Sequence, residues 1–123
     1  MDKKLILIAE DEVAYSKILK NTLEKEGYEV VVASNGEEFL KVVRMRSAVL
    51  VILDLVMPIK TGFQVIAEMK KDEKLKKIKI IALSNLGQEE DIERAKKLGA
   101  DEYIVKSDEA FYDVIRKIKK LLD

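Results

Sequence analysis

Five short apolar segments recur along the chain, and a longer segment with apolar residues at helical spacing follows each of them. Most of the short segments are continuous in Leu, Ile and Val, which is typical of strands buried on both faces of a sheet. The second segment partly alternates apolar and polar residues, which favours a place at the sheet edge. The predicted strands span residues 5–9, 28–33, 48–53, 78–83 and 103–105.

The segments between the predicted strands have the apolar spacing and the end signals of helices. Gly27 and Gly99 stand where C-terminal caps belong, and residues 34–38 form a turn and an N-terminal signal. The expected buried faces are Ala14, Ile18, Thr22 and Leu23 for the first helix, Phe39, Leu40 and Val43 for the second, Phe63, Ile66 and Met69 for the third, Ile92, Ala95 and Leu98 for the fourth, and Phe111, Val114, Ile115, Ile118 and Leu122 for the fifth.

The alternation of five strands with five helices predicts an α/β fold, in which a parallel sheet carries helices on both faces. Five strands, five helices and nine short connections of average length come to roughly 120 residues. The chain has 123 residues. We therefore expect a single domain over residues 1–123, with no output domain.

The composition narrows the function classes. The chain contains no His and no Cys, and its 23 Lys and Arg balance its 23 Asp and Glu. These counts exclude Ser-His-Asp triads and Cys–His pairs, and they leave oxygen as the ligand of any metal. Zero net charge gives no general attraction to nucleic acid or anionic lipid. The apolar runs are too short for a membrane span or a signal-peptide core, so we expect a soluble, cytoplasmic protein without nucleic-acid or membrane partners.

Polar residues follow four of the five predicted strands at the position where each strand ends. Because ligands bind outside the carboxyl ends of the strands in open α/β sheets, these residues are the candidates for a site. They are Glu10, Asp11 and Glu12 after the first strand, Asp54 after the third, Ser84 after the fourth and Lys106 after the fifth. Taken singly, each has an ordinary alternative role, such as helix capping, loop hydrogen bonding or solvation.

Several carboxylates at one sheet edge repel one another unless a cation lies between them. Mg²⁺ suits such a cluster because it prefers oxygen ligands and uses one or two carboxylates. We expect Asp11 and Asp54 to supply carboxylate ligands. Glu10 would orient a bound water, and the backbone carbonyl near Val56 would add a further ligand.

The same cluster makes Asp54 a candidate nucleophile, because a carboxylate can accept a phosphoryl group and form an aspartyl-phosphate. Phosphoryl transfer mostly requires in-line positioning and neutralisation of the equatorial oxygens. The Lys106 ammonium and the Ser84 hydroxyl would each cover one of these oxygens.

The order and spacing of these residues are specific. The chain carries Glu10-Asp11, then Asp54-Leu55-Val56-Met57-Pro58 with Gly62 four residues later, then Ser84, and finally Gly99-Ala100-Asp101-Glu102-Tyr103-Ile104-Val105-Lys106. With these motifs the chain resembles, over essentially its whole length, a response-regulator receiver domain of the single-domain, chemotaxis-regulator-like kind. The resemblance implies strand order 2-1-3-4-5 in a flavodoxin-like, doubly wound three-layer sandwich. It also implies Mg²⁺-dependent phosphorylation of Asp54 by the phosphohistidine of a sensor histidine kinase or phosphotransfer protein.

The resemblance also implies a switch. In the family, the hydroxyl residue at the Ser84 position moves towards the phosphoryl group, and the aromatic at the Tyr103 position turns inward. That movement remodels the surface of the fourth helix, fifth strand and fifth helix, where a downstream protein binds. The implied role is a phosphoacceptor that assists only its own phosphorylation and dephosphorylation, and not an enzyme, acting as a monomer or weak dimer. Tyr103 also has a simpler interpretation, as a static, half-buried strand aromatic.

Several positions depart from the family pattern. Ser107 replaces the usual proline after the lysine, so we predict a trans Lys106–Ser107 bond, because a cis bond before a non-proline residue costs about 3–4 kcal/mol. Asn85 replaces a small residue and narrows access to the site. Val56 and Leu86 are apolar where the family tunes attack by water, which predicts slow autodephosphorylation. The lysine at position 60 is interpreted as a solvated loop residue rather than a phosphate contact.

Two other function classes compete with a phosphorylated receiver. One is an unphosphorylated, receiver-like interaction module, which the substitutions at Ser107 and Asn85 favour. The other is a flavodoxin-like nucleotide binder or an aspartate-nucleophile phosphatase. The acidic loop after the first strand and the absence of glycine-rich phosphate loops oppose this last class.

Overall fold

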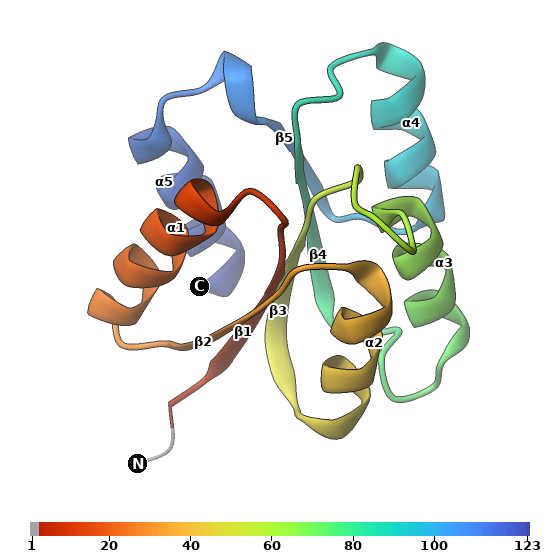
Figure 1. Cartoon of the computed structure of the whole chain (residues 1–123), viewed down its shortest axis with the longest axis horizontal. Helices are drawn as coiled ribbons and strands as arrows, with labels where there is room; N and C mark the ends of the chain where they lie inside the picture. The colour runs from red at the N-terminus through yellow and green to blue at the C-terminus, as the bar shows by residue number, and fades with distance from the viewer. Residues whose placement is uncertain (1–2) are drawn as a thin grey trace.

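A computed structural model describes residues 3–123 and contains a five-stranded sheet in the order β2-β1-β3-β4-β5 (Figure 1). All four strand pairs are parallel. The strands are β1 (Leu5–Ala9), β2 (Glu29–Ala33), β3 (Ala48–Leu53), β4 (Lys79–Ser84) and β5 (Glu102–Val105). The predicted α/β class, the strand order and the edge position of the second strand are confirmed. The predicted strand ends differ from the observed ones by at most one residue.

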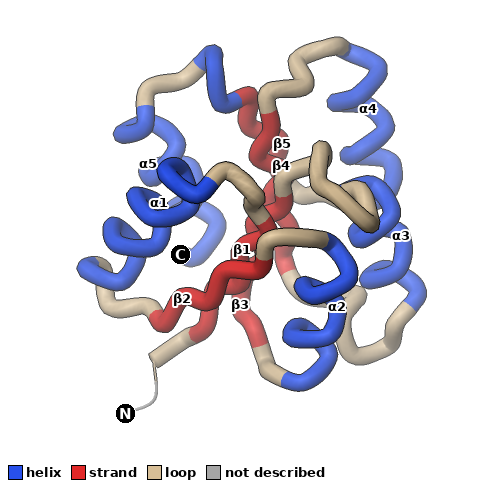
Figure 2. The backbone as a smooth tube through the Cα atoms, viewed as in Figure 1, coloured by secondary structure: helices blue, strands red, loops and turns tan. Residues whose placement is uncertain are grey.

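Helices cover both faces of the sheet and complete a three-layer sandwich (Figures 1 and 2). On one face lie α1 (Val13–Lys25) and α5 (Phe111–Leu122), and on the other lie α2 (Gly36–Met45), α3 (Gly62–Lys71) and α4 (Glu89–Leu98). A short 3₁₀ turn, η1 (Lys106–Asp108), joins β5 to α5. Within residues 3–123, no helix has the length and apolar character that a membrane crossing requires.

The sheet separates two apolar cores because successive strand residues point to opposite faces. Leu7 of β1 and Val51 of β3 pack towards α2, α3 and α4. Their neighbours Ile6 and Ile52 pack towards α1 and α5. Burial on both faces is the reason why these strands appear in the sequence as continuous apolar runs.

The ends of the helices follow the predicted signals. The Asn35 side chain accepts a hydrogen bond of 2.8 Å from the Glu38 amide and caps α2. Gly27 and Gly99 follow α1 and α4 with φ angles of 99° and 129°, which residues other than glycine rarely adopt. These caps set where each helix ends and where the next strand begins.

The predicted buried face of α1 is wrong at two positions. Ala14 is exposed and Ile18 is 54% exposed, whereas Ser16, Leu19 and Leu23 are buried. The segment contains two stripes at helical spacing, and the stripe that includes Leu19 and Leu23 packs on the sheet. The Ser16 hydroxyl is tolerated there because it donates to the Val13 carbonyl at 3.1 Å.

Candidate functional site

The loops at the carboxyl ends of four strands bring the predicted site residues together (Figure 2). Glu10 and Asp11 follow β1, Asp54 follows β3, Ser84 ends β4 and Lys106 follows β5. This convergence follows from the parallel sheet, since all strands point the same way. The resulting hollow is lined by Glu10, Asp11, Glu12, Asp54, Val56, Ser84, Asn85, Leu86 and Lys106.

Three carboxylates form a compact cluster in this hollow. Glu10, Asp11 and Asp54 each offer an oxygen, and these oxygens all lie within 4.8 Å of one another. Glu10 and Asp54 are buried, whereas Asp11 is exposed. Hard oxygen donors with one exposed member fit a cation such as Mg²⁺, which keeps several waters when bound. Val56, predicted to add a backbone ligand, lines the same hollow.

Backbone amides hold two of the carboxylates in place. The Glu12 amide donates to Glu10 Oε2 at 3.0 Å, and the Val56 amide donates to Asp54 Oδ1 at 3.0 Å. Each bond closes a small loop directly after a strand. The orientation of both carboxylates is therefore set by the backbone before any cation or phosphoryl group binds.

The Lys106 ammonium lies against this cluster. Its Nζ hydrogen-bonds Glu10 and lies 3.4 Å from Asp54 Oδ2, and its side chain is only 6% exposed. Burial alone would lower the pKa of Lys106. The hydrogen bond to Glu10 and the charges of Asp54 and Glu10 outweigh burial and raise it, so the ammonium stays charged.

One lysine does not neutralise the cluster. The pKa of Glu10 is raised to about 7, because burial, together with a smaller effect of the Asp54 charge, outweighs the hydrogen bonds from Lys106 and the Glu12 amide, which lower it. The charged form of this buried carboxylate is thus less well stabilised than it would be in water, and a cation beside it would favour that form. The electrostatics of the cluster therefore favour a bound cation.

A hydrogen-bond chain leads from the site towards α4. The Leu86 amide donates to the Ser84 hydroxyl at 3.3 Å, and the Tyr103 hydroxyl donates to the Leu86 carbonyl at 2.5 Å. Tyr103 is buried, and burial raises its pKa to about 12, with the charges of Asp91 and Asp54 adding to the shift. Tyr103 is thus not the half-buried aromatic of the simpler interpretation. The role of the Leu86 carbonyl leaves no signal in the sequence.

The loop between β3 and α3 differs from its sequence interpretation. Lys60 does not contact the carboxylate cluster, and it is not freely solvated, because its Nζ pairs with Glu68 of α3 at 2.6 Å. Thr61 and Gln64 form a reciprocal capping box at the start of α3, with hydrogen bonds of 2.9 and 3.2 Å.

Gly62 has a structural role beside the candidate nucleophile. A Cβ atom at this position would lie 2.4 Å from the Asp54 carbonyl oxygen and 2.7 Å from Leu55 Cα. The first turn of α3 therefore packs directly on the backbone of Asp54. Only glycine permits that approach.

The backbone after Lys106 is as predicted. Residues 3–123 contain no cis peptide bond, so the Lys106–Ser107 bond is trans. Lys106 is the first residue of η1, and its side chain nevertheless reaches both Glu10 and Asp54. The replacement of proline by Ser107 has not removed the ammonium from the site.

One aromatic residue of the site was missed from the sequence. The Lys106 Nζ lies 4.7 Å from the centre of the Tyr15 ring, on the first turn of α1. The only signal was an aromatic residue four positions after Asp11. Its contact with a residue 91 positions away depends on how α1 sits on the sheet.

Comparison with known proteins identifies the class. Residues 6–116 match the family model of the response regulator receiver domain. The probable transcriptional regulator ycf27 of Cyanophora paradoxa is 41% identical over 106 residues, covering 86% of this chain and 43% of that protein. The chain thus spans about two fifths of the length of this relative.

Solved structures agree with this class. Chemotaxis response regulator CheY4 of Vibrio cholerae superimposes with a TM-score of 0.89 at 23% identity, covering 98% of this chain and 99% of that one. The phosphorylated cyanobacterial phytochrome response regulator RcpA gives a TM-score of 0.82 at 30% identity, covering 95% and 89%. The Mn²⁺-bound form of response regulator Rcp1 gives 0.82 at 25% identity, covering 96% and 91%. The chain belongs to the response regulator receiver domain family.

Proposed function

We propose that the protein is a receiver that accepts a phosphoryl group on Asp54 from a phosphohistidine, in a Mg²⁺-dependent reaction. The donor would be a sensor histidine kinase or a phosphotransfer protein. The observation that carries this proposal is the placement of the buried Asp54 carboxylate between two further carboxylates and 3.4 Å from the Lys106 ammonium. The chain has no His and cannot supply the donor itself.

In the transfer step, an Asp54 carboxylate oxygen bonds to phosphorus while the bond between phosphorus and the donor imidazole nitrogen breaks. The electron pair of that bond leaves with the imidazole. The Lys106 ammonium exchanges part of its contact with Glu10 and Asp54 for a phosphoryl oxygen, and the Ser84 hydroxyl donates to another. Asp11, Asp54 and the backbone near Val56 would hold Mg²⁺, with Glu10 orienting its water, and the ion would offset negative charge on the phosphoryl group.

Phosphorylation would then alter a protein-binding surface. The Ser84 hydroxyl accepts from the Leu86 amide, and the Leu86 carbonyl accepts from Tyr103. A Ser84 hydroxyl that turns to the phosphoryl group gives up the first bond, which shifts the loop that holds Tyr103. The output surface would comprise α4, β5 and α5, and its downstream partner is a protein. This is a local charge change that biases a two-state packing element.

Two solved structures of similar proteins support this function. RcpA is described in its phosphorylated form and Rcp1 in a Mn²⁺-bound form. Both share the fold and at least a quarter of the sequence with this chain. By similarity to them, this chain would be phosphorylated and would bind a divalent cation.

The protein would act as a signalling switch and not as an enzyme with its own substrate. The hollow at the site is lined by apolar Val56 and Leu86, at positions that tune attack by water in the family. We expect these apolar side chains to slow hydrolysis of the aspartyl-phosphate. Measuring the decay of the phosphorylated protein tests this directly, and a lifetime of only seconds contradicts it.

The alternative of an unphosphorylated interaction module rested on Ser107 and Asn85. Asn85 lines the hollow, where its side chain would narrow access to the site, and this favours the alternative. Lys106 reaches Glu10 and Asp54 despite Ser107, which supports phosphorylation instead.

The direct test is incubation with acetyl phosphate and Mg²⁺, followed by mass spectrometry of the intact protein. We expect one added phosphoryl group in the wild type, none without Mg²⁺, and none in Asp54→Asn. Asp101→Asn is not a suitable control, because the Asp101 carboxylate accepts a hydrogen bond from the Ile80 amide and so has a structural role. Asp113→Asn removes an exposed carboxylate on α5 and should be phosphorylated like the wild type. A wild type that remains unmodified, or an Asp54→Asn variant that is modified equally well, contradicts the proposal.

A further inference from the structure

We infer that Tyr15 is a positioning residue for Lys106, holding its ammonium over the phosphoacceptor site. The inference rests on the proposed function, in which Lys106 covers a phosphoryl oxygen. The Lys106 Nζ lies 4.7 Å from the centre of the Tyr15 ring, within the range of a cation–π contact. The Lys106 side chain is 6% exposed, so water competes little with this contact.

The contact matters because it differs in kind from the other contacts of the Lys106 ammonium, which are ion pairs with Glu10, Asp54 and, at 3.7 Å, Glu12. A lysine carries a compact point charge on a four-carbon stem, and it lacks the rigid fork of arginine. The backbone that carries Lys106 is a single 3₁₀ turn, followed by Ser107 in a trans linkage. The local backbone constrains the side chain little, so the ring adds a restraint to those that the carboxylates supply.

The Tyr15 ring attracts the ammonium in a different way from the acid cluster. Glu10 and Asp54 attract the ammonium by charge, and both compete with an incoming phosphoryl group for it. The aromatic face attracts the cation but carries no net charge. Lys106 can therefore exchange a carboxylate for a phosphoryl oxygen while it keeps its contact with the ring.

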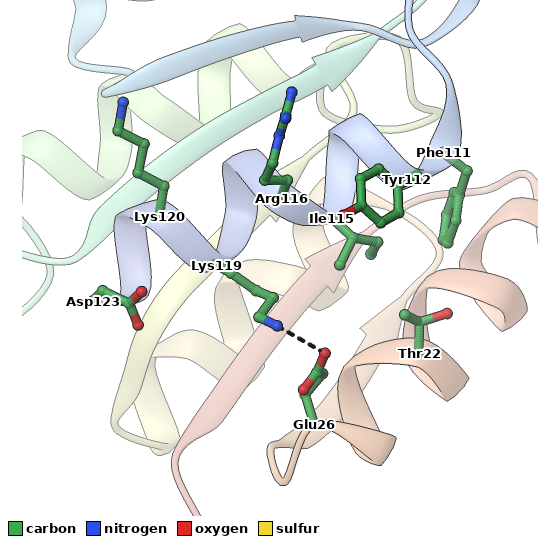
Figure 3. A pocket seen from close by; sticks show the side chains of 9 residues that line it. All are labelled: Thr22, Glu26, Phe111, Tyr112, Ile115, Arg116, Lys119, Lys120 and Asp123. Carbon is green, nitrogen blue, oxygen red and sulfur yellow. Dashed lines mark hydrogen bonds and ion pairs between the residues drawn. The ribbon is translucent and has the colours of Figure 1, made fainter.

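A second aromatic residue orients Tyr15. The rings of Tyr15 and Phe111 meet edge to face, with 5.9 Å between their centres and 75° between their planes. Phe111 is the first residue of α5 and lines the groove between α1 and α5 (Figure 3). Elsewhere in this groove, Lys119 of α5 pairs at 3.0 Å with Glu26, the residue that follows α1. Contacts thus join the two helices at both ends, and the edge-to-face contact with Phe111 restricts the orientation of the Tyr15 ring.

The placement can be tested without phosphorylation. An aromatic ring shifts the NMR signals of protons that lie over its face to higher field. We expect the Lys106 ε-methylene protons to be displaced in this way in the unmodified protein. The displacement should persist in Tyr15→Phe, which keeps the ring, and vanish in Tyr15→Leu. Tyr112→Leu is the matched control, because Tyr112 is 76% exposed on the same first turn of α5 as Phe111.

The functional consequence is tested with acetyl phosphate and Mg²⁺. We expect Tyr15→Leu to slow phosphorylation by about 5- to 30-fold, the range that corresponds to a partly or fully desolvated cation–π contact. Tyr15→Phe should remain within about twofold of the wild type, because the ring supplies the attraction. In a Lys106→Met background, Tyr15→Leu should cause no further loss. A role of Tyr15 in stability alone would lower the rate equally in both backgrounds.

The outcomes separate this inference from the proposed function. A wild type that is phosphorylated while Tyr15→Leu reacts at the same rate overturns the inference and leaves the proposed function standing. An absence of the ring-current displacement at Lys106 also overturns the inference. A wild type that shows the displacement but accepts no phosphoryl group overturns the proposed function, while the placement of Lys106 by Tyr15 is upheld.

Discussion

Two helices on opposite faces of the sheet, α5 and α4, are packed very differently. On one face, α5 buries Val114, Ile115 and Ile118 in a continuous stripe, and α1 buries Leu19 and Leu23 beside it. On the other face, α4 buries a single residue, Ala95, and presents charged side chains on most of its surface. Its other apolar residues, Ile92 and Leu98, are only partly buried.

This difference indicates which parts of the molecule can move. Most helical stability in proteins comes from the burial of an apolar face, so α4 has less holding it than α5. The contacts that do hold α4 include an Arg94 guanidinium 4.1 Å from the centre of the Phe63 ring on α3. The α1–α5 layer supports Lys106 through Tyr15, whereas the α4 side carries the chain from Ser84 to Tyr103. The α1–α5 layer thus holds the site in place, whereas α4 is suited to move when the site changes.

A matched pair of truncations should show the largest contrast. Ile118→Ala on α5 removes a fully buried side chain and should lower the free energy of unfolding by about 3–4 kcal/mol. Ile92→Ala on α4 removes a partly buried side chain and should cost about 1 kcal/mol. Urea denaturation measures both. Equal losses of unfolding free energy in the two variants would show that α5 and α4 are packed equally well.

A second pair compares glycines beside the site. Gly62→Ala places a Cβ atom 2.4 Å from the Asp54 carbonyl oxygen and should cost about 2–3 kcal/mol, because the α3 turn must move away. Gly87→Ala lies in the loop before α4, where the nearest atom is 3.6 Å away, and should be tolerated within about 0.5 kcal/mol. Thermal unfolding measures both variants. A tolerated Gly62→Ala would mean that the backbone of Asp54 is not held rigidly.

The cation–π contact of α4 should have a smaller effect. Arg94→Ala should lower the free energy of unfolding by about 1 kcal/mol and increase amide hydrogen exchange in α4. Arg116→Ala is the control on α5, because its bond to Asp113 is exposed and contributes little. If Arg94→Ala leaves α4 exchange unchanged, the guanidinium does not anchor this helix.

The smallest effect concerns the loop after β3. The hydrogen bond from Lys60 lowers the pKa of Glu68, so the folded protein binds fewer protons than the unfolded chain does. The stabilisation is therefore present above the ordinary pKa of Glu68 and is lost as the pH falls through the lowered value. Because the pair is about one third exposed, we expect at most about 0.5 kcal/mol.

Lys60→Met should weaken this dependence on acid pH, with Arg44 still beside Glu68. Lys77→Met is the matched control, because Lys77 makes no ion pair among the described residues. Acid titrations of the unfolding midpoint compare the two. If the acid profile of Lys60→Met matches that of the wild type, the Lys60–Glu68 pair contributes nothing measurable to the stability of the protein.

The sequence predicted most of the fold because continuous apolar runs specify buried parallel strands. It failed for the face of α1, where the stripes through Ile18 and through Leu19 are both at helical spacing. Only packing against the sheet decides between them. The strand order came from the family resemblance, since apolar periodicity does not specify which strands are neighbours.

The site was predictable to the extent that it depends on strand ends. Asp54, Ser84 and Lys106 converge because the carboxyl ends of parallel strands share one edge. The contacts of Tyr15 with Lys106 and of Tyr103 with the Leu86 carbonyl depend on loop conformations and on helix placement. No local pattern of residue types encodes either contact.

Phosphorylation at Asp54 is expected to act mainly on the α4 side of the molecule. The most direct measurement is an NMR titration of the wild type with Mg²⁺ and beryllofluoride, which forms an analogue of the phosphoryl group on the carboxylate. We predict large amide shift changes at the site, at Leu86, at Tyr103 and along α4, and small ones in the C-terminal halves of α1 and α5. Changes of equal size in both layers, or no change on addition of beryllofluoride, would contradict the account.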